Sequence, residues 1–229
     1  MGNLCIIPAR GGSKRIPRKN IKDFLGLPII AYSIKAALSS ELFDEVMVST
    51  DDEEISTIAM KYGAKVPFIR SNKNSDDYAS TIDVLIEVLA WYKENKGENY
   101  THGCCLYPTA PFVTAKSLNE GYQKLITNNK TTVFPVVPFS YPIQRALKIV
   151  NDNIELYQPE HELSRSQDLE PAFHDAGQFY WFKVESILKE KKLWTARSGT
   201  IILNETEAQD IDTLSDWKIA ELKFQLNNQ

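Results

Sequence analysis

The chain has 229 residues, of which 43% are hydrophobic and 24% are charged, and its formal net charge is −4. These fractions are typical of globular proteins and exclude disordered, collagen-like and low-complexity classes. No apolar stretch reaches the roughly 18 residues of a membrane-spanning helix, and the first residues lack a signal-peptide pattern. We therefore expect a single cytoplasmic domain over residues 1–229 that contacts no membrane.

The cysteines and histidines exclude a zinc site. Cys5, Cys104 and Cys105 are odd in number, lack a C-x-x-C spacing and lie in apolar, strand-like stretches, so we expect reduced core residues. The three histidines are scattered at positions 102, 161 and 174. Because structural zinc sites need clustered Cys and His ligands, any metal bound here must be held by oxygen.

Short apolar runs alternate along the chain with segments of helical periodicity. The runs predict strands at 3–8, 45–50, 103–107, 132–137 and 177–182. The i, i+3, i+4 spacing predicts helices at 28–39, 52–62, 80–94, 115–127 and 214–226. This alternation is typical of an α/β fold with a mostly parallel sheet flanked by helices.

The rhythm breaks at residues 138–175, which hold several prolines, aromatic residues and charges with little periodicity. Such a long irregular segment in a compact domain is usually functional, because it does not recover its ordering entropy alone. We expect an arm or lid inserted into the domain. After it, Thr213 and Asp216 have the spacing of a capping box for the last helix.

The loop after the first strand carries the strongest chemical signal. Arg10, Gly11, Gly12 and Lys14 lie there, within a segment, 10–22, that holds six lysines and arginines and no acid. Paired glycines let backbone N–H groups approach a phosphate, and the net acidity elsewhere favours a small polyanion over a long nucleic acid. The loop matches neither the P-loop nor the dinucleotide fingerprint. A solvated basic loop and a nucleic-acid-binding loop are the alternatives, although the segment lacks aromatic residues for base stacking.

The string from Ile7 to Ile21, with Arg10-Gly11-Gly12-Ser13-Lys14 at its centre, resembles the N-terminal signature of the acylneuraminate cytidylyltransferases, or CMP-sialic acid synthetases. The resemblance extends over the chain, through Ser49 to Asp52, Val66 to Arg70, Tyr107 to Pro111 and Asp210 to Thr213. It implies a Rossmann-like fold of the nucleotide-diphospho-sugar transferase type. It also implies a reaction in which the anomeric hydroxyl of a nine-carbon ulosonic acid attacks the α-phosphorus of CTP and releases pyrophosphate.

Two departures from the sialate pattern indicate a branch of this family. Tyr107 stands where sialate synthetases usually carry Gln, and His174-Asp175-Ala176-Gly177 replaces their Arg-Pro-Asn-Gly. These blocks, together with 142–146, 158–161 and 165–168, look like the branch that activates pseudaminic acid for bacterial glycans. Legionaminic acid and N-acetylneuraminic acid are the alternative sugars. CMP-Kdo synthetases resemble the chain less, because they carry a Gly-Asp-Glu-Pro turn at the position of Tyr107 to Pro111.

The resemblance implies a set of nucleotide contacts. Those expected around CTP are Ala9, Arg10, Gly11, Gly12, Ser13, Lys14, Lys19, Asn20, Arg70, Ala79 and Thr81. Arg10 and Lys14 would offset charge on the leaving pyrophosphate. Arg70 could instead be a surface charge, Ser80 could be a helix N-cap, and Asp51 and Asp52 follow a strand end where a cap is expected before a chemical role.

Asp210 and Asp212 are the expected ligands of Mg²⁺ or another divalent cation. Carboxylates at i and i+2 of an extended segment point to the same side and suit a hard cation. The family pattern adds that Asp212 could help to deprotonate the attacking hydroxyl. The alternative from sequence alone is that Asp212 only caps the helix that follows.

The sugar is expected to meet polar and aromatic side chains from the arm and the strands beside it. The candidates are Tyr107, Gln144, Arg145, Arg165, Gln167, His174, Gln178 and Tyr180. An arginine suits the sugar carboxylate, although the sequence does not say which one; His174 is a base or a structural residue. Tyr180 and Trp181 point to opposite faces of a strand. The resemblance also implies a homodimer in which the arm reaches the partner's site, and a CTP-binding sensor without turnover is the alternative from another class.

Overall fold

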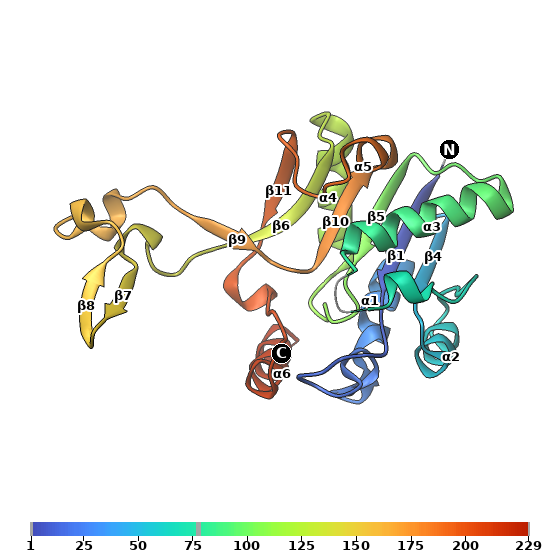
Figure 1. Ribbon diagram of the computed structural model, residues 1–229, viewed down its shortest axis with the longest axis horizontal. Coiled ribbons are helices and arrows are strands. Elements are labelled where there is room, and N and C mark those ends of the chain that lie inside the picture. Colours follow the sequence, from blue (N-terminus) through green and yellow to red (C-terminus); the bar gives the residue numbers. More distant parts are fainter. Residues whose placement is uncertain (1, 77–78, 229) are drawn as a thin grey trace.

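The computed structural model describes residues 2–76 and 79–228 of the chain (Figure 1). Within these residues a central sheet has the strand order β11-β6-β10-β5-β1-β4, and β9 pairs with β6. Its strands are β1 (Asn3–Pro8), β4 (Glu45–Ser49), β5 (His102–Leu106), β6 (Thr132–Pro138), β9 (Phe173–Asp175), β10 (Phe179–Lys183) and β11 (Ser198–Ile202). β1 is parallel to β4 and β5, and β11 is parallel to β6, whereas β10 is antiparallel to both β5 and β6. The predicted mostly parallel sheet is therefore confirmed.

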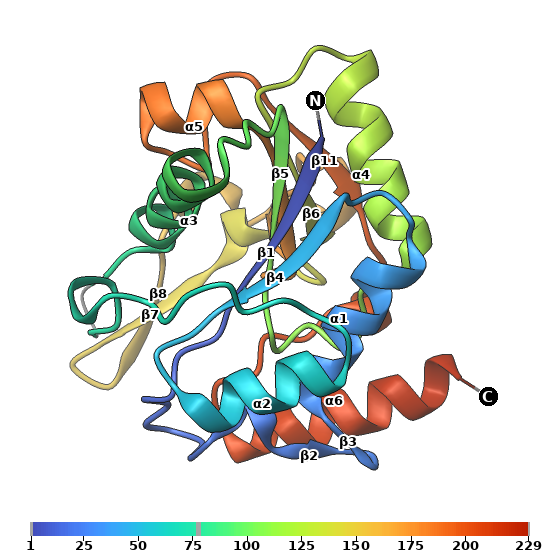
Figure 2. The same cartoon turned by 90° about the vertical axis from the view of Figure 1, so that its right-hand side faces the viewer.

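Helices cover both faces of the sheet (Figure 2). They are α1 (Ile29–Ser39), α2 (Glu53–Lys61), α3 (Thr81–Lys96), α4 (Ala115–Thr127), α5 (Val184–Glu190) and α6 (Leu214–Asn227). α1, α2 and α4 share one apolar cluster with Cys5, Cys104 and Trp181, while α3 and α5 share the opposite cluster with Cys105 and Tyr180. Successive strand residues alternate between the faces, which separates Tyr180 from Trp181 as predicted. All three cysteines are buried and free.

The predicted helices and strands are confirmed to within about two residues at their ends, the uncertainty expected of any assignment. Thr213 accepts from the backbone N–H of Asp216 and so forms the predicted cap of α6. α5 and β11 were not predicted. α5 has seven residues, and β11 begins with Ser198 and Gly199, so neither carries a long periodic pattern.

The inserted arm is a separate, mostly exposed structure that extends away from the sheet (Figure 1). Its centre is a hairpin of β7 (Leu147–Val150) and β8 (Asn153–Leu156). Asn151 and Asp152 connect these strands with φ values of 49° and 65°, which suit a tight two-residue turn. β2 (Asp23–Phe24) and β3 (Leu27–Pro28) form another short hairpin beneath α6.

The sheet positions three loops at one edge. β1, β4 and β5 run in the same direction, so the segments that follow Pro8, Ser49 and Leu106 leave the sheet together. Ligands of open parallel sheets bind outside the carboxyl ends of the strands. This edge is where the chain concentrates its basic and acidic loop residues.

Candidate functional site

A cleft of about 650 Å³ opens at this edge of the sheet. It is lined by many of the residues predicted to bind nucleotide, namely Arg10, Ser13, Lys14, Lys19, Asn20, Arg70, Ala79 and Thr81, together with Tyr107 and Asp212. These residues come from the loop after β1, the segments on either side of η2 (Asn72–Asn74), the start of α3, the end of β5 and the lead-in to α6. The fold thus gathers positive charge from distant parts of the sequence around one cavity.

The glycine loop is fixed by its backbone at two points. The N–H of Ala9 donates to the carbonyl of Ser49 at 2.9 Å, and the N–H of Gly11 donates to Asp51 Oδ1, also at 2.9 Å. Ala9, Gly11 and Gly12 are outside the lining of the cleft, which the loop reaches through Arg10, Ser13 and Lys14. The loop therefore presents side chains to the cavity while the amide of Gly11 faces a carboxylate.

Asn20 and Lys19 lie in the short 3-10 helix η1 (Lys19–Ile21) and connect the loop to the body of the protein. The Asn20 side chain is buried and donates to the carbonyl of Arg10 at 2.9 Å. Lys19 Nζ donates to the carbonyl of Ile211 at 2.7 Å and lies 3.4 Å from Asp212 Oδ1. Lys19 and Asn20 both line the cleft, and their hydrogen bonds also fix the segments that surround it.

Arg70 is a buried cation beneath the cleft, with 5% of its surface exposed. Its guanidinium donates to the hydroxyl and the carbonyl of Ser49, and burial lowers the pKa of Arg70. The alternative of a surface charge is wrong, because a cation that is buried with so little solvent contact has a specific environment. Ser80 is the N-cap of α3, as the sequence suggested, while Thr81 faces the cleft.

Asp212 faces the basic loop, and Asp210 lies two residues away on the same extended segment. Asp212 forms an ion pair of 2.9 Å with Arg15, and its capping role is excluded because Thr213 is the N-cap of α6. Burial, and then the negative charge of Asp212, raise the pKa of the Asp210 carboxyl. Asp212 lines the cleft, whereas Asp210 is outside its lining. The pair offers the one or two carboxylates that a Mg²⁺ ion binds before phosphate oxygens and water complete its shell.

Asp210 and Asp212 together offer few oxygen ligands for a metal ion. Within residues 2–76 and 79–228 there is no group of three or more His, Cys, Asp and Glu side chains that could hold a metal ion alone.

Three of the predicted sugar residues, Tyr107, Gln178 and Tyr180, lie together on neighbouring segments of the sheet. Tyr107 lines the cleft, and its ring centroid lies 5.5 Å from that of Tyr180, whose hydroxyl donates to Asp175 Oδ2 at 2.5 Å. Burial raises the pKa of Tyr180, so this hydroxyl stays protonated. Gln178 is buried and donates to the carbonyl of Glu207 at 2.6 Å. Tyr180 and Gln178 thus support the wall, and Tyr107 forms its surface.

The other predicted sugar residues belong to the arm and its return strand. Gln144 donates to the carbonyl of Glu170, Arg165 pairs with Asp168, and His174 lies against Phe139. Gln167 lines a small groove of the arm itself, and Arg145 lies in the 3-10 helix η3 (Ile143–Arg145) that precedes the hairpin. The arm projects away from the body, so one copy of the chain does not bring these side chains to the cleft (Figure 1).

Sequence reasoning missed several residues that line the cleft, among them Arg15, Asn74 and Asp76. Arg15 also pairs with Asp212. Arg15 was visible as part of the basic segment, whereas Asn74 carries no signal in a single sequence.

Comparison with known proteins shows the family of this chain. The sequence pattern of a family described as cytidylyltransferase matches residues 4–222. The chain belongs to the cytidylyltransferase family. It is 47% identical to the pseudaminic acid cytidylyltransferase of Campylobacter jejuni serotype O:2, an alignment that covers 100% of this chain and 99% of the relative. It is also 32% identical to the CMP-N,N'-diacetyllegionaminic acid synthase of Legionella pneumophila, over 99% of this chain and 97% of that protein.

Solved structures show the same fold at lower identity. A CMP:2-keto-3-deoxy-manno-octonic acid synthetase complexed with CTP superposes with a TM-score of 0.72 at 17% identity and covers 99% of this chain and all of that one. A 4-diphosphocytidyl-2C-methyl-D-erythritol synthase from Anaerococcus prevotii gives a TM-score of 0.62 at 13% identity, over 97% of this chain and 98% of its own. The cytidylyltransferase is therefore a nucleotidyltransferase with the predicted nucleotide-sugar transferase-like fold. None of its helices within the described residues combines the length and apolar character needed to span a bilayer.

Proposed function

We propose that this cytidylyltransferase transfers CMP from CTP to the anomeric hydroxyl of pseudaminic acid and releases pyrophosphate. The observation that carries the proposal is the 47% identity, over the whole length of both chains, to a pseudaminic acid cytidylyltransferase. The cleft supports it, because a glycine loop with Arg10, Ser13 and Lys14 suits a triphosphate. We place the reaction in the cytoplasm, since three free cysteines suit a reducing compartment.

We assign a different role in the reaction to each group of residues in the cleft. Arg10 and Lys14 neutralise charge that develops on the leaving pyrophosphate, while Arg70, Ala79 and Thr81 surround the cytosine and ribose. Lys19 and Asn20 hold the loop in place around the nucleotide. Asp212 accepts a hydrogen bond from the attacking hydroxyl and orients it toward the α-phosphorus. When bound by Asp210 and Asp212, a divalent cation would supply Lewis-acid polarisation of the phosphate.

The sugar subsite lies beside Tyr107, where Tyr180 and Gln178 support the wall. The arm residues complete it from a second copy of the chain in a homodimer. The hairpin supports this assembly because Leu147, Ile149, Ile154 and Leu156 are paired across the strands and share one face. Ile149 and Ile154 are 78% and 70% exposed, and an isolated two-stranded hairpin with an open apolar face is only marginally stable.

Pyrophosphate release tests the reaction and the sugar together. The chain is incubated with CTP and Mg²⁺ and, separately, with pseudaminic acid, N,N'-diacetyllegionaminic acid, N-acetylneuraminic acid and Kdo. We expect turnover with pseudaminic acid at a kcat/KM at least about 100-fold above the others, the discrimination that a few polar contacts supply. Preference for another ulosonic acid would support the proposed reaction and change the sugar assigned to it. CTP binding without turnover with any of the four sugars would favour a CTP-binding sensor.

A further inference from the structure

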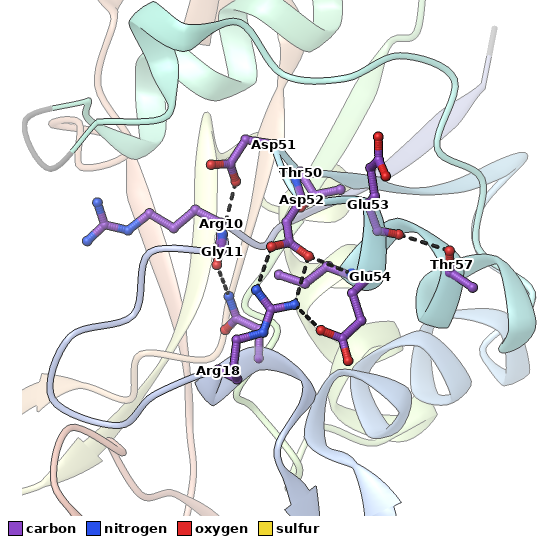
Figure 3. Close-up of polar contacts among 11 residues, drawn as sticks. Arg10, Gly11, Arg18, Thr50, Asp51, Asp52, Glu53, Glu54 and Thr57 are labelled. Atoms are coloured by element: carbon purple, nitrogen blue, oxygen red, sulfur yellow. Dashed lines mark hydrogen bonds and ion pairs between the residues drawn. The ribbon is translucent and has the colours of Figure 1, made fainter.

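The acidic turn after β4 contacts the basic loop on the side away from the cleft. Arg18 Nη1 donates to Asp52 Oδ2 at 2.5 Å, and Arg18 Nη2 donates to Asp52 Oδ1 at 2.8 Å. Nη2 also donates to Glu54 Oε2 at 2.5 Å. Figure 3 shows the guanidinium between these two carboxylates, with Asp51 bonded to Gly11 beside it. We call the group of Arg18, Asp52 and Glu54 the Arg18 latch.

The Arg18 latch joins the start of α2 to a loop residue in a left-handed conformation. Asp52 is the N-cap of α2, where its Oδ1 accepts from the N–H of Ile55 at 3.0 Å. Arg18 has a φ of 56°, a left-handed conformation that costs about 1 kcal/mol in a residue other than glycine. That conformation persists where surrounding contacts hold it, and the two-point contact to Asp52 is such a restraint.

The glycine loop also lies directly against Asp52. A Cβ placed on Gly11 would come within 2.7 Å of Asp52 Oδ2, so a larger residue there would displace either the loop or the carboxylate. Together with the Gly11 to Asp51 hydrogen bond, this contact fixes the start of the loop, and Arg18 fixes its end. The segment that carries Ser13 and Lys14 is therefore held at both ends by one acidic turn.

Charge explains why such a restraint is useful. Residues 10–22 carry six positive charges and no negative one, and their mutual repulsion opposes a compact loop until a polyanion binds. Hydrogen bonding from Arg18 lowers the pKa of Asp52 to about 2, and the same contact raises the pKa of Arg18. The pair is ionised throughout the neutral range, and it places negative charge beneath the loop without placing it in the cleft.

We propose that Arg18 and Asp52 are positioning residues for the triphosphate, and that Arg18 acts through the loop and does not touch the nucleotide. The Arg18 latch holds the loop in the shape that directs Arg10, Ser13 and Lys14 into the cleft before CTP arrives. Binding then costs less ordering entropy, which is the general advantage of a preorganised site. This inference rests on CTP being the ligand of the cleft, as proposed above.

A double-mutant cycle on CTP affinity tests the proposal. The variants are Arg18→Met, Asp52→Ser and the pair together, since serine keeps the helix cap and removes the carboxylate. CTP affinity is measured by calorimetry without sugar, beside KM for CTP, kcat and the thermal midpoint. We expect each single variant to weaken CTP binding about 10-fold, with a smaller change in kcat. We expect the double variant to bind no more weakly than either single one.

Two further variants separate the latch from general electrostatics. Arg18→Lys keeps the charge and loses the two-point contact, so its affinity should be intermediate. Lys22→Met removes another of the six positive charges of the segment, and it should change CTP affinity less than about twofold. Equal losses of CTP affinity in Lys22→Met and Arg18→Met would overturn the proposal. They would show that only the total positive charge of the segment matters.

The remaining outcomes are also decisive. Additive losses in the double variant would mean that Arg18 and Asp52 act independently, and unchanged affinity in Arg18→Met would show that the latch has no role in binding. If Asp52→Ser fails to fold, Arg18→Met and Arg18→Lys still test the prediction, because Arg18 precedes η1 without a side-chain capping hydrogen bond. Affinity is measured without sugar, so a wrong sugar assignment leaves the test intact, whereas a wild-type chain that binds no CTP would overturn both proposals.

Discussion

The basic loop, residues 10–22, and the arm, residues 138–175, both leave the sheet at the end of a strand, yet they are held in opposite ways. The loop is bound to the body by Asp51 and Asp52, and by Lys19, which donates to the carbonyl of Ile211. The arm makes its polar contacts mostly within itself, as in the pairing of Lys148 with Glu155. It also exposes large apolar side chains, among them Tyr141 at 84% and Leu163 at 94%.

The difference shows what each kind of group needs. A few carboxylates and carbonyls are enough to pair the cationic side chains of a loop, and a single chain supplies these acceptors in the turn beside it. An apolar face is stabilised only when a large part of its surface is covered, because the hydrophobic effect scales with the surface removed from water. The described chain therefore forms the cleft by itself, while the exposed apolar side chains of the arm support the dimer proposed above.

The largest effect is expected at the cleft itself. Asp212→Asn removes the carboxylate that we propose orients the attacking hydroxyl, and we expect kcat to fall by about 100- to 1,000-fold with CTP affinity within a few-fold. The measurement is steady-state pyrophosphate release beside calorimetric CTP binding. Asp216→Asn, which changes the α6 cap, is the matched control and should keep kcat within about twofold. Unchanged turnover in Asp212→Asn would limit Asp212 to pairing with Arg15 and Lys19.

The arm predicts a change in assembly. Replacing Ile149 and Ile154 by Asp charges both strands of the apolar face, and we expect a dimer to become a monomer of 26.0 kDa by light scattering. CTP affinity should change less than about threefold, because the cleft lies within one copy. Lys148→Ser, on the polar face of the same hairpin, should stay dimeric. A wild-type chain that is monomeric and fully active at low concentration would contradict the comparison between loop and arm.

The smallest expected effect is on acid stability. Arg18 lowers the folded-state pKa of Asp52 to about 2, below that of the unfolded chain, so the pair stabilises the protein above about pH 4. This contribution is lost as pH falls through 2, and partial exposure limits it to about 1 kcal/mol. Urea unfolding of wild type and Asp52→Ser should show a difference at pH 7 that shrinks from pH 4 toward pH 2. A difference independent of pH would show that the ionised pair of Arg18 and Asp52 does not account for it.

Much of the site was readable from the sequence because its signals are local. The glycine pair, the basic run and the closely spaced Asp210 and Asp212 identify themselves within a few residues. Arg70 carried less signal, since its burial under Ser49 depends on a contact between separate loops. The Arg18 latch carried still less signal in the sequence, because a residue at the position of Asp52 is expected to cap the next helix. In the structure Asp52 both caps α2 and pairs with Arg18.

The sequence by itself determined the order and type of the main helices and strands, because apolar periodicity reports which side of an element is buried. It also placed Arg10, Ser13 and Lys14 in one short loop, and the structure brings all three to the cleft. Only the tertiary structure decided that β10 runs antiparallel between β5 and β6, that Tyr180 supports Tyr107, and that the arm residues lie away from the cleft. These features depend on contacts between residues far apart in the chain, and a residue's own sequence neighbourhood does not record which distant surface it meets.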